Sequence, residues 1–492
     1  MIRELLPSYA CTLVVPVDGV IAQQARSLGI PVVVQDVPLV VSLYLALPHF
    51  QGDIRMEQQG GAWQELFSLI NRERPDIVLT NTCVHALPAM AAKFLGIPVV
   101  WTIMEAMRQT PDTPAAAAVI GQYSDCIVGI SETALAPLRT AEMLPKSKLI
   151  PPSWQHSELA EDTWRGHRMN RRRQLGIADD QRLVGYISSS IFSAKGLEHF
   201  VLMAVAVAQR FEKAVFLIVG NPVDTDYFEQ CLNLAREQNV IDRFRWIRFE
   251  EQIETIYPAM DVLVVPSMTP EGFGMTALEG MVFGKPVVVY GSGGLAEIAN
   301  ATGNSRYIVE TGNVDGLFQK VSGLLGDEME RAVVGERNAR MAVSAFGIAA
   351  YRERIRKLID LLAGFSPVKK QVVRGTAGTV YLLEDGILRP FASEEAFLQE
   401  GYRFEEVKEV PDAMLAALPH GMSIGRSSKK ASIVTRKRKT GRRRRGRRRK
   451  LLPGRRSSAA KRRRHAARRT RTVRPQRRRK SAAGITRSRR RH

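Results

Sequence analysis

The chain has 492 residues, of which 45% are hydrophobic and 25% charged, so it is long enough for two or three globular domains. The four cysteines are far apart and form no C-x-x-C pair, which argues against a disulfide framework and against a zinc site. The net charge of +23 is concentrated at one end, because residues 426–492 hold 33 Lys and Arg and no Asp or Glu. No segment resembles a signal peptide, and no apolar run reaches the roughly 20 residues that a membrane span needs. We therefore expect a cytoplasmic protein, with a peripheral position at the inner face of the membrane as an open alternative.

In chain order, short apolar runs alternate with helical stretches. The first series has runs at 11–16, 30–34, 76–80, 97–103 and 125–130, and a second series has runs at 182–187, 214–220, 244–249, 261–266 and 286–290. Continuous Val, Ile and Leu predict strands buried on both faces, and their alternation with helices predicts parallel sheets. We predict an α/β protein with two doubly wound, Rossmann-like domains, residues 1–170 and 171–345, that face a cleft.

Three further segments follow the two domains. Residues 346–366 read as a helix that packs back on the body. Residues 375–423 read as a small α+β module, with a hairpin turn at Glu384 to Gly386 and Ser393 as a helix N-cap. Residues 426–492 are predicted to be a disordered tail, because like charges repel and little apolar surface is available. Such a tail is expected to bind a polyanion, such as nucleic acid, anionic lipid or a wall polymer; a solvated tail without a specific partner is the alternative.

One segment carries the strongest chemical signal, "PSMTPEGFGMTALEGMVFGKPVVV". A strand is predicted to end at Val265, a helix to begin at Met275, and glycines to form the turn between them. The helix N-terminus suits a phosphate group, and the carboxylates of Glu271 and Glu279 can accept hydrogen bonds from sugar hydroxyls. The pattern predicts a nucleotide-sugar site. Solvated acids that complement the helix dipole remain the alternative.

The stretch "EGFGMTALE" resembles the E-x7-E signature of the large retaining glycosyltransferase family with the GT-B fold, a family 4-like group. Flanking segments agree with it: "YPAMDVLVVPS", "EGMVFGKPVVVYGSGGLAEI" and, earlier in the chain, "SAKGLEHFVLMAV". The resemblance covers residues 1–365. It implies transfer of a sugar, with retention of configuration, from a UDP- or GDP-sugar to a glycan, a lipid carrier or a cell-envelope polymer. It implies no metal and no cofactor beyond the sugar donor.

The resemblance also implies roles for single residues. Lys195 would neutralise the donor diphosphate, Glu271 would contact the transferred sugar, and Glu279 would hold the ribose hydroxyls. The remaining donor-binding candidates are Gly272, Phe273, Gly274, Met275, Thr276, Gly196 and Ser190. Stabilising the charge of the departing nucleotide diphosphate is the main electrostatic task of such a reaction.

The sequence departs from the family pattern at three places. Ser190 stands where the family often has an arginine. In "WTIMEAM", Met104 replaces a histidine, which leaves Glu105 as the candidate acceptor contact and catalytic residue, while His85 is expected at a helix start. The opening "MIRELLPSYACTLVVP" resembles the end of the family's first helix and its second strand. Either the start of the sequence is misassigned or the first strand is missing, and its loss would expose an apolar edge and lower stability.

Three alternatives remain open at this point. "DTD", Asp224 to Asp226, can hold a divalent cation, although acids before a helix are more often caps. The body could be a catalytically impaired GT-B protein whose basic tail binds nucleic acid or another polyanion, or it could be an epimerase. The 375–423 module resembles a unit appended to envelope-related bacterial proteins, which favours a bacterial source and an envelope acceptor.

Overall fold

The computed structural model describes residues 1–155 and 159–425, which fall within one compact unit, Met1–Ser427. The basic tail, with its predicted disorder and its predicted polyanion partner, lies outside the described residues.

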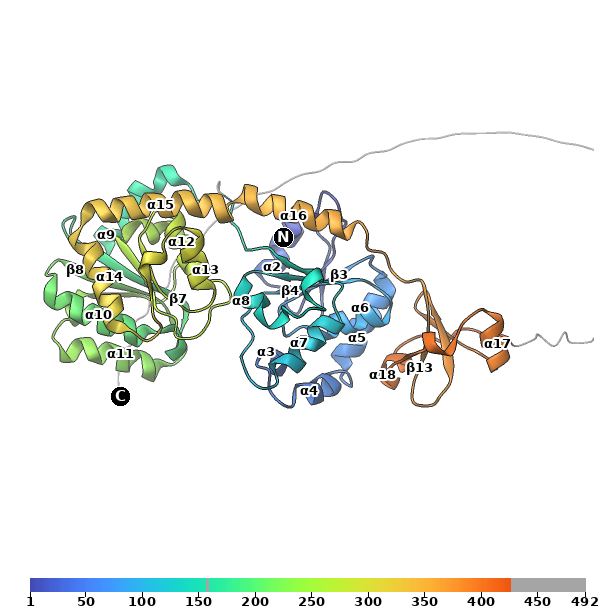
Figure 1. Cartoon of the computed structure of the whole chain (residues 1–492). Coiled ribbons are helices and arrows are strands. Elements are labelled where there is room, and N and C mark those ends of the chain that lie inside the picture. The colour runs from blue at the N-terminus through green and yellow to red at the C-terminus, as the bar shows by residue number, and fades with distance from the viewer. Residues whose placement is uncertain (156–158, 426–492) are drawn as a thin grey trace, which may run out of the picture. The chain divides into compact units, whose positions relative to one another are not determined.

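The first domain contains two parallel sheets (Figure 1). Its strands are β1 (Leu13–Val15), β2 (Val32–Val34), β3 (Val78–Asn81), β4 (Val99–Ile103), β5 (Cys126–Gly129) and β6 (Ser147–Leu149). Its helices are α1 (Ile2–Leu5), α2 (Val20–Ser27), α3 (Val41–Tyr44), α4 (Phe50–Glu57), α5 (Gly61–Glu73), α6 (Ala86–Phe94), α7 (Thr113–Gln122) and α8 (Glu132–Leu135). The five predicted strand runs of this half are confirmed as β1 to β5.

The sheet of the first domain is divided between β1 and β3. Among the described residues, strands β1 and β2 pair only with each other, and a separate sheet has the order β3-β4-β5-β6. Strands β4 and β5 are buried throughout, whereas only Thr80 of β3 is buried. In a doubly wound sheet the first strand lies between the second and the fourth. The division therefore falls where the first strand of such a sheet would lie.

The second domain is one doubly wound sheet with the order β12-β11-β10-β7-β8-β9, all parallel. The strands are β7 (Arg182–Ile191), β8 (Ala214–Pro222), β9 (Phe244–Ile247), β10 (Val262–Val265), β11 (Val287–Tyr290) and β12 (Ile308–Val309). The helices are α9 (Trp164–Gln174), α10 (Leu197–Arg210), α11 (Thr225–Glu237), α12 (Met275–Val282), α13 (Gly294–Ala301), α14 (Val314–Gly326) and α15 (Glu328–Phe346). All five predicted strand runs of this half are confirmed.

Helices cover both faces of this second sheet, which explains its continuous apolar strands. Successive residues of β10 point to opposite faces: Val262 and Val264 pack with α10, α11 and α14, while Leu263 and Val265 pack with α12, α13 and α15. Figure 1 shows the two groups of helices on either side of the strands. A strand buried on both faces has no polar positions to alternate with apolar ones.

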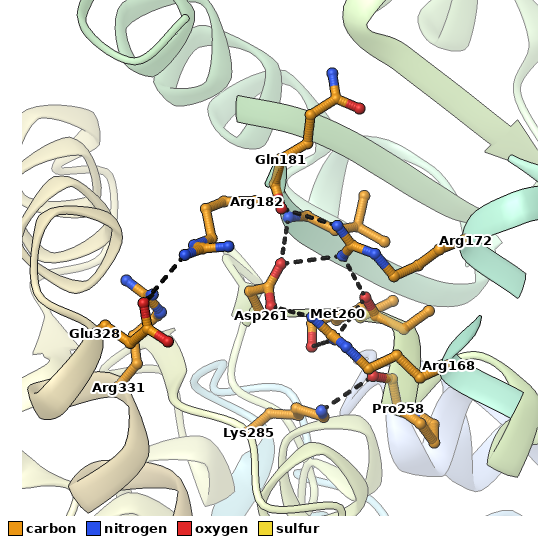
Figure 2. A network of polar contacts seen from close by, with 12 residues as sticks. Arg168, Arg172, Gln181, Arg182, Pro258, Met260, Asp261, Lys285, Glu328 and Arg331 are labelled. Carbon is orange, nitrogen blue, oxygen red and sulfur yellow. Dashed lines mark hydrogen bonds and ion pairs between the residues drawn. The ribbon is translucent and has the colours of Figure 1, made fainter. Parts of the chain in front are cut away.

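Helix α9 belongs structurally to the second domain, although a boundary at residue 170 would divide it. Arg168 donates to Asp261 Oδ1 at 2.7 Å and to the Met260 carbonyl at 3.2 Å, and Arg172 donates to Asp261 Oδ2 at 3.2 Å (Figure 2). Burial pushes the pKa of Asp261 up, but Arg168, the Leu183 N–H and Arg172 outweigh it and hold the pKa below its usual range. The whole helix is therefore anchored at the start of β10, so the second domain begins before residue 171.

After the second domain the chain returns to the first. The helix predicted over 346–366 is observed as α16 (Ile348–Leu362), which α15 precedes; α15 ends at Phe346, and the extended backbone of Gly347 separates the two helices. Apolar residues of α16, including Tyr351 and Ile355, share a cluster with Val100 of β4 and Val128 of β5. The predicted return of this helix to the body is thus observed.

The small module has the sheet order β15-β14-β13-β16. Its elements are β13 (Lys370–Arg374), β14 (Val380–Glu384), β15 (Ile387–Pro390), α17 (Glu394–Gln399), β16 (Lys408–Glu409) and α18 (Asp412–Ala416). The hairpin turn is confirmed, with φ of +50° at Asp385 and +76° at Gly386, and Ser393 caps α17 by accepting from the Ala396 N–H. Gln371 of β13 donates to the Phe94 carbonyl at 2.6 Å, which attaches the module to the first domain.

The described residues also show the state of the cysteines and the lengths of the apolar helices. The four cysteines are free thiols, and three of them are buried. Among residues 1–155 and 159–425, no helix is both long enough and apolar enough to cross a bilayer.

Candidate functional site

The strand order of the second domain locates its ligand-binding edge. The first strand of this domain, β7, lies beside its fourth strand, β10. From this pair the chain continues to β8 and β9 on one side of the sheet and to β11 and β12 on the other. Ligands of doubly wound sheets bind beyond the carboxyl ends of the strands at such a switch point. Lys195 lies in the short 3-10 helix Ser193–Lys195 that follows β7, and Glu271 lies in the loop that follows β10.

Lys195 and Glu271, far apart in sequence, form an ion pair at this edge. The Nζ of Lys195 lies 2.7 Å from Oε1 of Glu271, and both side chains are partly exposed. The Ser267 hydroxyl donates to the same carboxylate oxygen at 2.6 Å. Sequence reasoning missed Ser267, although it follows the buried strand directly and stands four residues before Glu271. One oxygen of Glu271 is therefore fixed by two donors.

Gly196 allows the two loops to approach each other. Its φ is +69°, and a Cβ at this position would lie only 1.9 Å from the Pro266 carbonyl oxygen. The Met268 N–H donates to the Ala194 carbonyl at 2.9 Å, which joins the loops directly. Any larger residue would therefore separate Lys195 from the Glu271 loop. The structure thus gives Gly196 a role in packing beside the predicted one in donor binding.

Helix α12 begins at the same edge with an electropositive end. Its N-cap is Gly274, with φ of +104°, and no side chain from the described part of the chain caps its first N–H groups. No acidic residue lies in its first turn. Unpaired N–H groups and the helix dipole favour an anion at this position. Met275 and Thr276 open the helix, whereas the ring of Phe273 is buried against Phe346, so that only its backbone can face a ligand.

Glu279 lies one turn into α12, and a hydrogen bond from Tyr257 fixes its carboxylate. The Tyr257 hydroxyl donates to its Oε2 at 2.6 Å. Burial raises the pKa of Glu279, and the hydrogen bond from Tyr257 opposes that rise. Its other oxygen, Oε1, accepts no hydrogen bond within the described residues. Tyr257 was not identified from the sequence, because nothing in "IYPAM" distinguishes a tyrosine that orients a carboxylate from one that fills the core.

The first domain contributes Glu105 next to the Glu271 loop. A Cβ at Gly272 would lie 2.6 Å from the Met104 carbonyl oxygen and 3.2 Å from the Glu105 Cα, so this glycine permits two backbones to meet. Glu105 Oε2 accepts from the Cys83 N–H at 3.1 Å. The close approach at Gly272 is to protein backbone, a reason that differs from the predicted one, approach to a ligand.

Tyr44, at the end of α3, has a pKa that the charges of two candidate site residues influence. Burial is the main cause that raises its pKa, and the negative charges of Glu105 and Glu271 raise it further. Tyr44 lies in the apolar run "VPLVVSLYLALP", a pattern that indicates only a buried segment.

A second contact between the domains involves Glu297 of α13 and the start of α8. Glu297 accepts from the Glu132 N–H at 2.8 Å and from the Thr133 N–H at 2.7 Å, and the Thr133 hydroxyl also donates to it. The Ser131 hydroxyl donates to the Gly272 carbonyl. Glu297 was part of the family resemblance but had no predicted role; here its carboxylate caps a helix of the other domain.

Other candidates have local structural partners. The carbonyl of Ser190, in β7, accepts from the Ser188 hydroxyl, and no contact with Lys195 is observed among the described residues. Asp224 caps α11 by accepting from the Tyr227 N–H, which confirms the cap alternative for this residue. His85 is the N-cap of α6, as predicted. Among residues 1–155 and 159–425, no group of three or more His, Cys, Asp or Glu is placed to hold a metal ion.

The second domain is similar to known proteins in sequence. Residues 168–341 match the family model described as glycosyl transferases group 1. The chain is 30% identical over 161 residues to an uncharacterized glycosyltransferase of Methanocaldococcus jannaschii. It is 31% identical over 173 residues to a D-inositol 3-phosphate glycosyltransferase of Corynebacterium urealyticum. These matches cover 32% and 34% of this chain, and the chain spans about 40% of the length of each relative.

Solved structures extend the likeness to both domains. HepE of Anabaena, in complex with UDP, superposes with a TM-score of 0.60 at 18% identity, over 73% of this chain and 95% of that one. WaaG, a glycosyltransferase involved in lipopolysaccharide biosynthesis, superposes with a TM-score of 0.54 at 13% identity, over 74% of this chain and 93% of that one. The predicted GT-B arrangement of two Rossmann-like domains is confirmed.

Proposed function

We propose that this chain, whose residues 168–341 belong to the glycosyl transferases group 1, is a retaining glycosyltransferase that moves a sugar from a nucleotide-diphosphate sugar to an acceptor. One observation carries the proposal: Lys195, Glu271 and the uncapped start of α12 meet at the switch point of a doubly wound sheet. A cation, a carboxylate and free N–H groups there suit a diphosphate joined to a polyol.

The site residues take the following roles in this proposal. Lys195 and the α12 N-terminus stabilise the negative charge that grows on the departing nucleotide diphosphate. Glu271, held through Oε1, presents its other oxygen to the transferred sugar, and Glu279 binds the ribose. Glu105 faces the acceptor from the first domain. Because lysine and helix end already supply positive charge, we propose that no metal is required, and that the donor is a UDP- or GDP-sugar.

The proposal extends to the acceptor and to the location of the enzyme in the cell. HepE is solved with UDP and with UDP-glucose, and one relative is a lipopolysaccharide 1,2-N-acetylglucosaminetransferase of Salmonella typhimurium. These names support a nucleotide-sugar donor and an acceptor that is a glycan, a lipid carrier or a cell-envelope polymer. We propose a bacterial cytoplasmic enzyme at the inner face of the membrane, brought to an anionic surface by residues 426–492.

Loss of Lys195 or Glu271 tests the proposal. We expect purified wild-type protein to be stabilised against heat by UDP- or GDP-sugars and to hydrolyse or transfer the matching sugar. Lys195→Ala and Glu271→Ala should each lower turnover by a factor of about 100 to 1,000, as removal of a transition-state contact does. Lys213→Ala and Glu229→Ala, which remove members of exposed ion pairs, serve as matched controls and should keep full turnover.

Two results would count against the enzyme. If no nucleotide sugar raises the melting temperature and no donor supports turnover, the transferase proposal fails. If the donor sugar is isomerised without an acceptor, the chain is an epimerase with the same site.

A further inference from the structure

Tyr257 lies behind the ligand-binding edge and contacts one of its carboxylates. It belongs to the 3-10 helix Tyr257–Ala259, between β9 and β10, and its side chain is fully buried. Its ring stacks on Phe283 at the end of α12, with a centroid distance of 5.2 Å and an interplanar angle of 13°. This packing holds the ring, and its hydroxyl lies 2.6 Å from Glu279 Oε2 and 3.4 Å from the Thr276 carbonyl oxygen, so the carboxylate is the nearer acceptor.

The two glutamates of the E-x7-E segment are held in the same manner. Glu271 uses Oε1 to accept from Lys195 and Ser267, and Glu279 uses Oε2 to accept from Tyr257. The second oxygen of each carboxylate accepts no hydrogen bond within the described residues. Neither of these two oxygens is among the fully buried polar atoms that lack a partner. Each carboxylate therefore has one oxygen committed to the protein and one that can accept from a ligand.

We propose that Tyr257 is a positioning residue for the nucleotide, whose hydroxyl fixes Glu279 so that Oε1 of this carboxylate meets the ribose hydroxyls of a nucleoside diphosphate. The proposal rests on the proposed function, because it takes the ligand of this edge to be a nucleotide. It adds a residue that does not touch the ligand and acts through Glu279.

The chemistry of the pair suits a fixed contact. Burial, followed by the charge of Glu279, raises the pKa of Tyr257 well above its ordinary value, so the hydroxyl stays protonated and remains a donor. A hydrogen bond to a carboxylate is stronger than one between neutral groups. A ribose contact is the same in the bound substrate and in the transition state, so its loss raises KM and leaves kcat unchanged.

The test compares Tyr257→Phe with wild type, using UDP and GDP and their 2′-deoxy counterparts as probes in titration calorimetry. The variant keeps the ring and its stacking and removes one hydroxyl. We expect affinity for the ribonucleotide to fall about tenfold, which corresponds to the usual strength of one hydrogen bond to a charged group. Affinity for the 2′-deoxynucleotide should fall less than about threefold, because this probe lacks the 2′-hydroxyl and therefore part of the ribose contact with Glu279 that Tyr257 supports.

Tyr307→Phe is the matched control. Tyr307 is also buried, and its hydroxyl donates to Glu330 Oε1 at 2.7 Å, so the same chemical pair is broken at a position outside the site. This variant should bind both nucleotides like wild type. With a matching sugar donor, Tyr257→Phe should raise KM while kcat stays within about twofold of wild type.

Two other outcomes would overturn the inference, and they distinguish it from the proposed function. If Tyr257→Phe binds the ribonucleotide like wild type, or weakens both nucleotides equally, Tyr257 only fills the core and the inference is overturned, while the proposed function stands. If wild type binds neither UDP nor GDP, the proposed function fails first and the inference falls with it.

Discussion

Lys285, in the "GKPVV" segment, is a buried cation with one hydrogen bond. Its Nζ donates to the Pro258 carbonyl at 3.2 Å, as Figure 2 shows. Burial, followed by the charge of Arg168, lowers its pKa to about 8 from an ordinary value of 10.5. A buried cation among arginines costs stability unless neighbouring anions compensate it.

We expect Lys285→Met to be more stable than wild type at pH 7, by at most about 3 kcal/mol, because methionine carries no charge to desolvate. As the pH rises from about 8 to 10.5, the folded wild-type chain releases this proton before the unfolded chain does. The unfolded state then binds more protons, so wild-type stability rises and the advantage of the variant shrinks. Denaturant unfolding at pH 7 and pH 10 measures both effects.

Lys357→Met provides the control for this measurement, because Lys357 is an exposed residue of α16. Its stability difference from wild type should be small and independent of pH over the same range. An advantage of Lys285→Met that is absent at pH 7, or that grows toward pH 10, would contradict the argument.

At the scale of elements, the divided sheet separates the strands of the first domain into two classes. β4 and β5 are buried and paired on both edges, whereas β1 and β2 have three residues each and pair on one edge. Large apolar side chains are exposed around the short pair: Val17, Val20, Ile21 and Val34. Few buried contacts and free edges mark regions that open at low free energy.

We therefore expect the amides of Leu13–Val15 and Val32–Val34 to exchange with deuterium at least about tenfold faster than those of Val99–Ile103. Peptide-level hydrogen exchange at neutral pH measures this directly. Equal protection of the two groups would show that β1 and β2 open together with the rest of the domain. The β4 and β5 peptides serve as the internal reference, since both lie within the same chain.

The elements also show how far local pattern predicts structure. The ten apolar runs became strands because a strand buried on both faces must be apolar along its length. Strands β6, β12 and β13 were not predicted. β12 has only two residues and β6 is "SKL", so neither has an apolar run, and their strand pairing depends on neighbours brought by the fold.

At the scale of the whole molecule, charge is divided between an acidic body and a basic end. Residues 1–425 carry a net charge of −10, and residues 426–492 carry all of the excess positive charge. We expect removal of residues 426–492 to leave nucleotide-sugar turnover in solution unchanged and to abolish binding to nucleic acid or anionic vesicles. That binding should weaken steeply with salt in the full chain, because each neutralised phosphate releases counterions.

The same truncation separates the two functions considered for this chain. If turnover disappears while the melting temperature of the body is unchanged, the tail takes part in catalysis and the division of labour proposed here is wrong. If wild type has no turnover but binds nucleic acid, the body is an impaired glycosyltransferase and the tail carries the function.

The sequence by itself determined the two Rossmann-like domains, the edge at which Lys195 and Glu271 would meet, and the resemblance of the second domain to glycosyltransferases. These follow from apolar runs, turn glycines and short motifs, which are local. Only the tertiary structure decided that Ser267 and Tyr257 hold the two carboxylates, that Gly272 meets the backbone of Glu105, and that Glu297 caps a helix of the first domain. Those contacts depend on how distant loops pack, and local pattern carries no information about which side chain will face a given carboxylate.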